Sequence, residues 1–530
     1  MDKPVVLIAE ELSPATVDAL GPDFEIRHCA GADRAALLDA LPGADAVLVR
    51  SATRMDAEAI EAATRLKVIG RAGVGLDNVD VTAASRAGVM VVNAPTSNIV
   101  SAAEHTVGLL LAVARNIPQA DAALKAGHWQ RSRFTGVELA DKTLGIIGLG
   151  RIGSLVARRM AAFGMKLLAY DPYVQAGYAE RTGVRAVALD TLLDEADFLT
   201  VHLPRTPETA GLIGFDALHR VKPGVRIVNA SRGGIVDEAE LYAALKEGRV
   251  AGAAIDVFAT EPCTGSPLFE LDNVVVTPHL GASTAEAQER AGVSVARSVR
   301  EALSGRFVPE AVNVRMGEVD AELDPWLPLA ERLGRLFTAT AGGLPGQLRV
   351  TVSGEIARHD VVALELASLK GVLGQVVDGG VSYVNAPLIA QERGLGVEVH
   401  SGPDSPVHRS VVRVDGTLPS GEPVSVTGTL SGLRSGARLV EICGYEVDVE
   451  LDGDLAFFLA PDAPGVIGAV SEVLGQAGTP VESLRIVRGA GAREAALVAV
   501  GLGGRVAQTV LDDASAAIDA TRGWSLERTG

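Results

Sequence analysis

Three side chains capable of acid–base and anion chemistry, Arg232, Glu261 and His279, each follow a short apolar run near the middle of the sequence. Runs of this length, rich in Val and Ile and bounded by turn residues, are typical of buried strands in a parallel sheet. The runs are 225–228, 252–255 and 274–276. Because the carboxyl ends of parallel strands lie at one edge of a sheet, we expect the three side chains to meet in one cleft.

An arginine, a carboxylate and a histidine in one cleft can oxidise or reduce a hydroxy acid. Arg232 would hold a substrate carboxylate through two parallel hydrogen bonds and polarise the carbonyl beside it. His279 would accept the hydroxyl proton during oxidation and return it during reduction. Glu261 would hydrogen-bond the imidazole, fix its tautomer and stabilise its charged form.

Each of these residues taken alone has an ordinary alternative interpretation: a turn arginine, a solvated loop glutamate, or a core histidine. Their joint placement at the ends of neighbouring strands favours the catalytic interpretation. His202, in Thr200-Val-His-Leu-Pro, is the competing histidine. It has no nearby Glu–Pro partner, so we expect it to line a cofactor pocket or to be structural.

The stretch from Thr143 to Asp171 predicts a dinucleotide site. An apolar strand runs into Gly148-x-Gly150-x-x-Gly153, and an amphipathic helix then leads to a second strand that ends at Asp171. The first glycine permits the tight turn, the second lets the backbone approach a pyrophosphate, and the third allows helix and strand to pack closely. The helix start attracts the phosphates. Asp171 would bind the ribose hydroxyls and repel a 2′-phosphate, which favours NAD over NADP.

The composition bounds the class of protein. The chain has 530 residues, of which 48% are hydrophobic and 22% charged, so we expect roughly three or four folded domains. No apolar run approaches the ~20 residues of a membrane span, and the N-terminus carries no signal-peptide pattern. The net charge of −18 disfavours a nucleic-acid or anionic-membrane partner, and the 3 cysteines are too widely spaced for a disulfide framework or zinc site. We therefore expect a cytoplasmic protein without a bound metal.

Alternating strand and helix patterns place the candidate residues in two α/β domains. Short β-type runs alternate with helical patterns over residues 4–100, and strand candidates follow between 143 and 285. A helical pattern from Thr284 to Gly305 would return the chain to the first domain. We expect two Rossmann-like doubly wound domains, the first of them discontinuous, with a cleft between them. The expected boundaries are 1–98 with 286–310 for the first domain and 99–285 for the second.

Two further modules follow a linker at 308–325. Residues 318–452 are rich in glycine and strand patterns, which predicts an α+β domain between the catalytic part and the C-terminus. Residues 454–530 show the βαββαβ order of a ferredoxin-like fold. Because no catalytic constellation appears after residue 310, we expect both modules to serve regulation or assembly.

Two arginines of the first domain predict a second anionic group on the substrate. Arg50 ends the apolar strand that begins at Ala46, and Arg71 ends the strand that begins at Lys67. Arg71 is followed by Gly73-Val-Gly, whose N–H groups can approach an anion. The alternative is that these side chains extend into solvent from the strand ends. We expect both to face the cleft and bind a phosphate.

These motifs resemble the D-isomer-specific 2-hydroxyacid dehydrogenase family, and most of all its long-form members that act on 3-phospho-D-glycerate. The matching blocks are 70–80, 96–98, 148–153, 229–238 and 278–284. The resemblance covers essentially the whole chain. It implies NAD-linked oxidation of 3-phospho-D-glycerate to 3-phosphohydroxypyruvate, the first step of the phosphorylated pathway to L-serine. It also implies a homotetramer and a C-terminal ACT domain, a fold that commonly binds amino acids.

The resemblance assigns further contacts at the positions that match the family motifs. The implied cofactor contacts, besides the three glycines and Asp171, are Val74, Arg151, Ile152, Leu203, Ala230, Ser231, Arg232, Asp256, His279, Gly281 and Ala282. The implied substrate contacts, besides Arg50 and Arg71, are Ser51, Gly73, Asn98 and Arg131. Arg131 would act across a subunit contact. Val74 and Leu203 stand where relatives often carry hydroxyl residues, and both would contact the cofactor through backbone or apolar surface.

The C-terminal module departs from the pattern of serine-inhibited relatives. Asp462 keeps the acidic residue that in those relatives holds the amine of the effector. Pro480 stands where they typically carry Asn, and proline lacks both the amide side chain and the backbone N–H. We therefore expect weak or absent inhibition by L-serine.

Two other functions stay open at this stage. The same chemistry would serve another D-2-hydroxy acid, one whose oxidised form is a 2-oxo acid such as hydroxypyruvate or glyoxylate. A protein of a different class, a sensor whose assembly responds to NAD, would keep the dinucleotide site without needing turnover. The joint presence of Arg232, Glu261 and His279 favours the enzyme.

Overall fold

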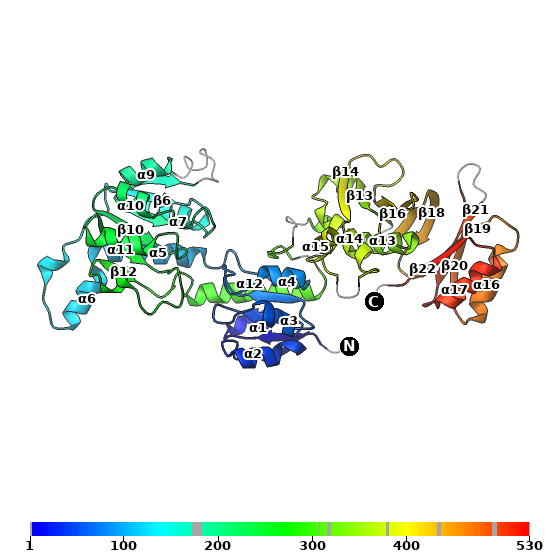
Figure 1. Ribbon diagram of the computed structural model, residues 1–530, viewed down its shortest axis with the longest axis horizontal. Helices are drawn as coiled ribbons and strands as arrows, with labels where there is room; N and C mark the ends of the chain where they lie inside the picture. Colours follow the sequence, from blue (N-terminus) through cyan, green and yellow to red (C-terminus); the bar gives the residue numbers. More distant parts are fainter. Residues whose placement is uncertain are drawn as a thin grey trace.

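The computed structural model describes residues 3–171, 183–306, 308–314, 320–377, 381–431, 436–489 and 495–528. These residues form four β-sheets, numbered in sequence order, that lie in a row along the extended molecule (Figure 1). The first sheet lies between the second sheet on one side and the third and fourth sheets on the other. The chain is therefore a row of modules, with the N-terminal sheet near its middle.

The first sheet is parallel throughout, and its strand order is β2-β1-β3-β4-β5. Its strands are β1 (Val5–Ile8), β2 (Glu25–His28), β3 (Ala46–Val49), β4 (Val68–Arg71) and β5 (Met90–Val92). Its helices are α1 (Pro14–Leu20), α2 (Arg34–Ala40), η1 (Leu41–Gly43), α3 (Ala57–Ala62) and α4 (Val81–Arg86). We did not predict β2, because this edge strand is polar and largely exposed and therefore lacks an apolar run.

Helix α12 (Ala285–Leu303) follows all strands of the second sheet in the sequence, but it packs on the first sheet. Its Val295 lies so close to β4 that a Cβ on Gly70 would be 2.5 Å from Val295 Cγ1. Thr284 caps the helix by accepting a hydrogen bond from the N–H of Ala287 (3.1 Å). The long helix thus returns the chain to the N-terminal sheet, which makes this part of the fold discontinuous in sequence.

The second sheet is also parallel, and its strand order is β12-β11-β10-β9-β6-β7-β8. Its strands are β6 (Thr143–Ile147), β7 (Lys166–Tyr170), β8 (Arg185–Ala186), β9 (Phe198–Val201), β10 (Val225–Asn229), β11 (Val250–Ile255) and β12 (Val274–Val276). Its helices are α5 (Ile99–Arg115), α6 (Ile117–Lys125), η2 (Arg131–Phe134), α7 (Arg151–Ala161), α9 (Leu189–Glu195), α10 (Phe215–Arg220), α11 (Glu238–Lys246) and η3 (Pro267–Glu270). From β6 the sheet extends through β7 and β8 on one side and through β9 to β12 on the other. This reversal of strand order beside β6 is the doubly wound arrangement.

Residues Ser101 to Glu104 have the Ser-x-x-Glu spacing of a capping box, which predicts that a helix begins there, but in the structure this pattern does not mark the helix start. Helix α5 begins at Ile99, with Asn98 as its N-cap residue, so Ser101 lies inside the first turn. The hydroxyl oxygens of Ser101 and Thr284 are 2.8 Å apart. This hydrogen bond joins the two places where the chain crosses between the first and second sheets.

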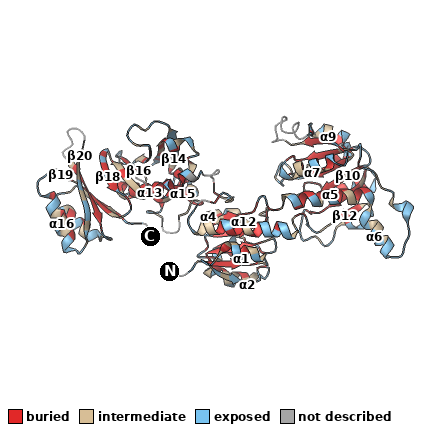
Figure 2. Cartoon of the chain, turned by 180° about the vertical axis from the view of Figure 1, so that it is seen from behind, coloured by how far each residue is buried: buried red, intermediate tan, exposed pale blue. Residues whose placement is uncertain are grey.

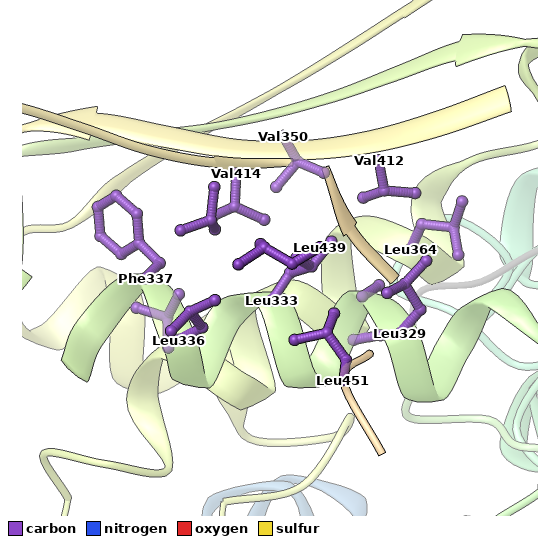
Figure 3. Packing of buried hydrophobic residues seen from close by; sticks show 14 of the residues in the cluster. Leu329, Leu333, Leu336, Phe337, Val350, Leu364, Val412, Val414, Leu439 and Leu451 are labelled. Atoms are coloured by element: carbon purple, nitrogen blue, oxygen red, sulfur yellow. The ribbon is translucent and has the colours of Figure 1, made fainter. Parts of the chain in front are cut away.

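The third sheet is mixed, because β13 pairs in parallel with β14 and antiparallel with β15. Its strands are β14 (Gly396–Gly402), β13 (Gln347–Gly354), β15 (Ser410–Thr417), β16 (Pro423–Ser431), β17 (Gly436–Ile442) and β18 (Tyr445–Glu450). Its helices are η4 (Ala321–Leu323), α13 (Trp326–Ala341), η5 (Glu355–Arg358), α14 (Val362–Leu373) and α15 (Ala386–Glu392). Figure 3 shows Leu333, Leu336 and Phe337 of α13 directed toward Val350 and Val414 of the sheet. This core is α+β, as expected.

The fourth sheet is antiparallel, with strand order β20-β21-β19-β22. Its elements are β19 (Asp454–Pro461), α16 (Val466–Gln476), β20 (Val481–Arg488), β21 (Ala495–Leu502), α17 (Gln508–Ala517) and β22 (Arg522–Leu526). The βαββαβ order matches the ferredoxin-like prediction. The buried Arg332 of α13 donates hydrogen bonds to the carbonyls of Gly453 and Glu527, which attaches this sheet to the third module.

Buried residues concentrate on the sheets and on the helix faces that cover them (Figure 2). Helix α6 differs, since none of its residues is buried. Among the described residues, no helix is both long and apolar enough to cross a membrane.

Candidate active site

The glycine-rich turn after β6 has the geometry of a dinucleotide cradle. Gly148 has a φ of 100°, and a Cβ there would lie 2.8 Å from the carbonyl carbon of His202. A Cβ on Gly153 would lie 2.1 Å from the carbonyl oxygen of Gly148, so only glycine lets α7 start this close to the strand. At Gly150 no atom of the described residues lies within 4 Å of the Cβ position, which leaves the backbone open to a ligand. These environments match the three roles that the pattern predicts.

Asp171 lies beside this turn, at the end of β7. Its Oδ2 accepts a hydrogen bond from the N–H of Leu149 (2.8 Å), so the carboxylate is held next to the glycines. A fixed negative charge here suits ribose hydroxyls and repels an added ribose phosphate. The open backbone at Gly150, the start of α7 and this carboxylate together fit NAD.

Several other predicted cofactor positions lie on the same edge of the second sheet. Leu203 is buried, and its Cδ2 would be 3.1 Å from a Cβ on Gly148. Ser231 turns its hydroxyl toward Asn229 Oδ1 (2.9 Å). Ile152 and Ala230 pack at the border of the neighbouring core, and Arg151 is exposed at the first turn of α7.

A cleft of about 320 Å³ separates the carboxyl ends of the first two sheets. The predicted residues that line it from the first sheet are Arg50, Ser51, Arg71, Gly73 and Val74. Those that line it from the second sheet are Arg232, Glu261, His279 and Ala282. Asn98, at the N-terminus of α5, also lines the cleft. The structure therefore brings the two predicted groups, acid–base and anion-binding, to opposite walls of one site.

His279 and Glu261 form a hydrogen-bonded pair. Nδ1 of His279 lies 2.7 Å from Oε2 of Glu261, while Oε1 of Glu261 accepts from the N–H of Phe258 (2.9 Å). An ionised carboxylate only accepts hydrogen bonds, so Nδ1 carries the hydrogen and Nε2 is the nitrogen left for proton transfer. The Glu261–Pro262 peptide is cis, and His279 has a φ of 54°. The two hydrogen bonds of Glu261, one to the Phe258 amide and one to Nδ1 of His279, hold the imidazole in its orientation.

Asp256 organises the loop that carries His279. The fully buried carboxylate accepts hydrogen bonds from Thr277 Oγ1 (2.6 Å) and from the N–H groups of Leu280 (2.7 Å) and Gly281 (3.0 Å). His105 of α5 places Nε2 3.2 Å from Oδ1 of the same carboxylate. Burial by itself would raise the pKa of Asp256, but the hydrogen bonds from His105, Thr277 and Leu280 outweigh it and lower that pKa.

Arg232 crosses from the second sheet toward the first. Its Nη1 donates to the carbonyl of Ser231 (2.8 Å), and its Nε lies 3.9 Å from Oδ2 of the exposed Asp77. A Cβ on Gly75 would lie 2.8 Å from Nη2 of Arg232, so this glycine makes room for the guanidinium. Arg232 therefore lies at the centre of the cleft, between the two walls.

Arg71 is the more enclosed of the two first-sheet arginines. Its Nε is buried and has no hydrogen-bond partner among the described residues. Burial lowers the pKa of Arg71, and the positive charge of Arg232 acts in the same direction. A Cβ on Gly73 would collide with Nη1 of Arg71, at 1.7 Å. The guanidinium thus lies against the loop 73–75, close to other cations, in a setting that favours an anionic ligand.

Arg131 is the predicted substrate residue that does not reach the cleft within one chain, and the predicted regulatory residue Asp462 lies in another module. Arg131 is exposed in η2, on the segment that follows α6, and does not line the site. Asp462 lies in the fourth module, where its carboxylate accepts hydrogen bonds from Arg488. This ion pair lowers the pKa of Asp462. The competing His202 contacts Thr200 Oγ1 (3.0 Å), and burial lowers its pKa to about 4, so it is neutral at ordinary pH and fits the structural alternative.

Sequence reasoning missed two residues beside the site, His105 and Glu10. Neither belongs to a recognisable motif, and each acts on the backbone or side chains of an element remote in sequence. The available signal for Glu10 was an acidic residue just after the first strand, next to strands that end in arginines. No local signal marks His105, which lies within a helical apolar pattern.

Within the described part of the chain, one group of metal-ligand type lies away from the cleft, formed by Asp320, Glu322 and His359. Arg358 donates to both Glu322 and His359. A guanidinium among the ligands would repel a metal cation. The group is therefore an ion-pair network between η4 and η5, and we assign no metal to it.

Comparisons with known proteins agree with this geometry. Residues 107–281 match the family described as D-isomer specific 2-hydroxyacid dehydrogenase, NAD binding domain. Residues 322–443 match the D-3-phosphoglycerate dehydrogenase intervening domain. Among solved structures, the TT0316 protein from Thermus thermophilus is 34% identical with a TM-score of 0.54, over 58% of this chain and 99% of that one. The D-lactate dehydrogenase from Aquifex aeolicus, solved with NAD and lactic acid, is 29% identical with a TM-score of 0.50, over 57% of this chain and 96% of that one.

Full-length relatives are similar across all four modules. A D-3-phosphoglycerate dehydrogenase from Mycobacterium leprae is 54% identical over 486 residues, which cover 92% of each chain. A D-3-phosphoglycerate dehydrogenase from Archaeoglobus fulgidus is 43% identical over 475 residues, or 89% of this chain and 90% of the relative. With such identity over nearly its whole length, the chain belongs to the D-3-phosphoglycerate dehydrogenase family.

Proposed function

We propose that the protein oxidises 3-phospho-D-glycerate to 3-phosphohydroxypyruvate with NAD, the first step of the phosphorylated pathway to L-serine. The observation that carries the proposal is a cleft with Arg50 and Arg71 on one wall and the His279–Glu261 pair on the other. 3-Phosphoglycerate has a carboxylate, a hydroxyl and a phosphate on three successive carbons. Arg232 suits the carboxylate, His279 the hydroxyl, and the two first-sheet arginines the phosphate.

The proton moves on the side chains of the second sheet. Arg232 binds the C1 carboxylate and thereby orients C2. Nε2 of His279 accepts the proton of the C2 hydroxyl, since Nδ1–H is already bound by Glu261. The carboxylate of Glu261 stabilises the imidazolium that results. NAD, when bound, accepts the hydride from C2.

The cofactor would be held by the glycine-rich turn and the strand ends next to it. We assign the pyrophosphate to Gly148, Gly150 and Gly153 at the start of α7, and the ribose to Asp171. The further cofactor contacts in this proposal are Val74, Arg151, Ile152, Leu203, Ala230, Ser231, Arg232, Asp256, His279, Gly281 and Ala282. Asp256 contributes through the loop that its carboxylate holds.

The competing substrate is an unphosphorylated D-2-hydroxy acid, and a comparison of two oxo acids separates the alternatives. We expect NADH oxidation to be far more efficient with 3-phosphohydroxypyruvate than with hydroxypyruvate. Arg71→Ala should remove most of this difference by raising the KM for the phosphorylated acid. Equal efficiency with both acids in the unaltered enzyme would overturn the assignment of the phosphate.

We further propose that the enzyme is a homo-oligomer, with the segment 117–134 in its interface and a tetramer as the whole assembly. Helix α6 has no buried residue, and Ile117 (54% exposed), Leu124 (56%) and Trp129 (83%) expose large apolar surface on it and just after it. Large apolar side chains exposed together on one short segment are typical of a protein–protein contact. Arg131, in the same segment, would then lie in the contact and reach the cleft of a second subunit.

We propose catalytic domains at 1–98 with 286–310 and at 99–285. We further assign residues 318–452 to regulation or assembly and residues 454–530 to regulation. The ACT-like βαββαβ module would take an amino-acid effector at Asp462, whose carboxylate Arg488 now engages. Because Pro480 offers neither amide nor N–H to an effector, we expect little inhibition of NADH oxidation by L-serine. Strong inhibition at micromolar serine would contradict this reasoning.

We place the enzyme in the cytoplasm, where thiols such as Cys29, Cys263 and Cys443 stay reduced.

A further inference from the structure

We infer that Glu10 and Asn78 are positioning residues that shape the turn 50–53 and thereby set the preference for a phosphorylated substrate. This inference deepens the proposed function and rests on it. Neither residue is among the described residues that line the cleft. Both contact the backbone of the turn that carries Arg50 and Ser51.

Glu10 binds the amide groups of the turn. It follows β1, directly beside the end of β3, and its Oε1 accepts from the N–H groups of Arg50 (2.7 Å) and Thr53 (2.9 Å). Its Oε2 accepts from the N–H of Ala52 (3.2 Å). Three of the four amides of the turn are thus directed to an internal carboxylate, all except that of Ser51. A substrate phosphate here would therefore be recognised by Ser51 and above all by the side chain of Arg50, both of which line the cleft.

Asn78 binds the carbonyl groups of the same turn. Its Nδ2 donates to the carbonyls of Arg50 (2.6 Å) and Thr53 (2.5 Å), and its backbone carbonyl accepts from the N–H of Met55 (2.9 Å). A carboxamide supplies the two donors that this arrangement needs, whereas an aspartate would supply none. With its amides held by Glu10 and its carbonyls by Asn78, the turn is fixed at both ends.

A fixed turn matters because the anion site combines like charges. Arg50, Arg71 and Arg232 lie near one another, and the negative charge of Glu10 acts on Arg71 against their repulsion. Loss of the Glu10 side chain would free the turn, so that phosphate binding must order it again at a cost in conformational entropy. Loss of the charge alone would instead strengthen the attraction for an anion. Replacement by glutamine separates these two effects.

The test compares KM values in the full-length enzyme for 3-phosphohydroxypyruvate, hydroxypyruvate and NADH. Glu10→Ala removes hydrogen bonds to a charged group, and Asn78→Ala removes two neutral hydrogen bonds; for each we expect the KM for the phosphorylated acid to rise by roughly ten- to a hundred-fold. The kcat/KM for hydroxypyruvate and the KM for NADH should change by less than about three-fold, since a defect confined to the turn touches neither. Glu10→Gln keeps an acceptor for the amides and should restore a KM near that of the unaltered enzyme.

Glu11→Ala is the matched control, because it removes the same charge one residue along from an exposed position. It should leave all three KM values unchanged. The inference is overturned if the unaltered enzyme prefers the phosphorylated acid and both alanine variants keep that preference. It is also overturned if the variants raise the three KM values alike, which indicates general damage that thermal unfolding would reveal. If the unaltered enzyme shows no preference at all, the proposed function itself fails.

Discussion

Removal of the Asp256 side chain should damage both the stability of the second module and the reaction rate. The buried carboxylate holds the loop that carries His279, through Thr277 Oγ1 (2.6 Å) and the N–H groups of Leu280 (2.7 Å) and Gly281 (3.0 Å). Asp256→Ala leaves these three donors without their acceptor. No other carboxylate of the described residues hydrogen-bonds them.

The magnitude follows from the number and type of these hydrogen bonds. Each bond to a charged acceptor contributes about 1.5–3 kcal/mol, and each unsatisfied buried donor costs about 1–3 kcal/mol. A simple sum over the three donors would overstate the loss, because in the variant the loop would relax and water would enter. Breaking one partner of a buried charged network typically costs ~3–5 kcal/mol, and we expect that loss in the free energy of unfolding for Asp256→Ala. Asp256→Asn keeps one acceptor oxygen and should lose less.

The rate should fall because His279 moves with the loop. A shift of about 1 Å in a catalytic group costs on the order of a hundred-fold, so we expect kcat to fall by about that factor. The KM for 3-phosphohydroxypyruvate should change little, since Arg50, Arg71 and Arg232 lie on other loops.

The stability contribution of Asp256 also depends on pH. Burial opposes ionisation, but the hydrogen bonds from His105, Thr277 and Leu280 outweigh it, and the folded-state pKa is lowered. A carboxylate with a lowered pKa stabilises the fold above its unfolded pKa of about 3.9, and the contribution is lost as the pH falls through the folded value. The difference in unfolding free energy between the unaltered protein and Asp256→Asn should therefore shrink below about pH 4.

Urea unfolding and steady-state assays measure both effects. Asp237→Ala is the matched control, since Asp237 also accepts from two amides, of Ala239 and Glu240 (both 3.0 Å), but as the cap of α11. It should lose about 1 kcal/mol and keep its kcat. Unchanged stability and kcat in Asp256→Ala would show that the carboxylate does not hold the loop.

Three further predictions concern the cleft and the exposed arm. His279→Ala should lower kcat for NADH formation by ~10²–10⁴ while fluorescence titration still detects NADH binding, and a near-normal kcat would refute its role as the base. Gly73→Val should raise the KM for 3-phosphohydroxypyruvate, because its side chain displaces the guanidinium of Arg71, whereas an unchanged KM would mean that Arg71 does not bind the phosphate. Trp129→Ser should shift the enzyme to smaller assemblies in sedimentation velocity, and an unchanged assembly would exclude Trp129 from the interface.

The amino-acid sequence was sufficient for the parts of the site that depend on neighbours in the chain. The turn from Gly148 to Gly153 requires glycine for backbone reasons that hold within a few residues, and the structure shows the close contacts that demand it. Arg232, Glu261 and His279 were predictable because apolar runs mark buried strands and parallel strands end at one edge. Their meeting in one cleft follows from topology, which the alternating pattern already indicated.

Other features were decided only by the tertiary structure. Glu10 binds the turn 50–53 across some 40 residues of chain, and His105 reaches Asp256 from α5. Such side chains hydrogen-bond to one particular backbone segment or carboxylate, and a contact of this kind leaves no periodic pattern in the sequence. The polar edge strand β2 and the start of α5 before Ser101 escaped prediction for a related reason, since pairing and packing outweighed local preference there. The sequence thus determined which groups meet in the cleft, and the fold determined what holds them in place, because that support comes from residues distant in the chain.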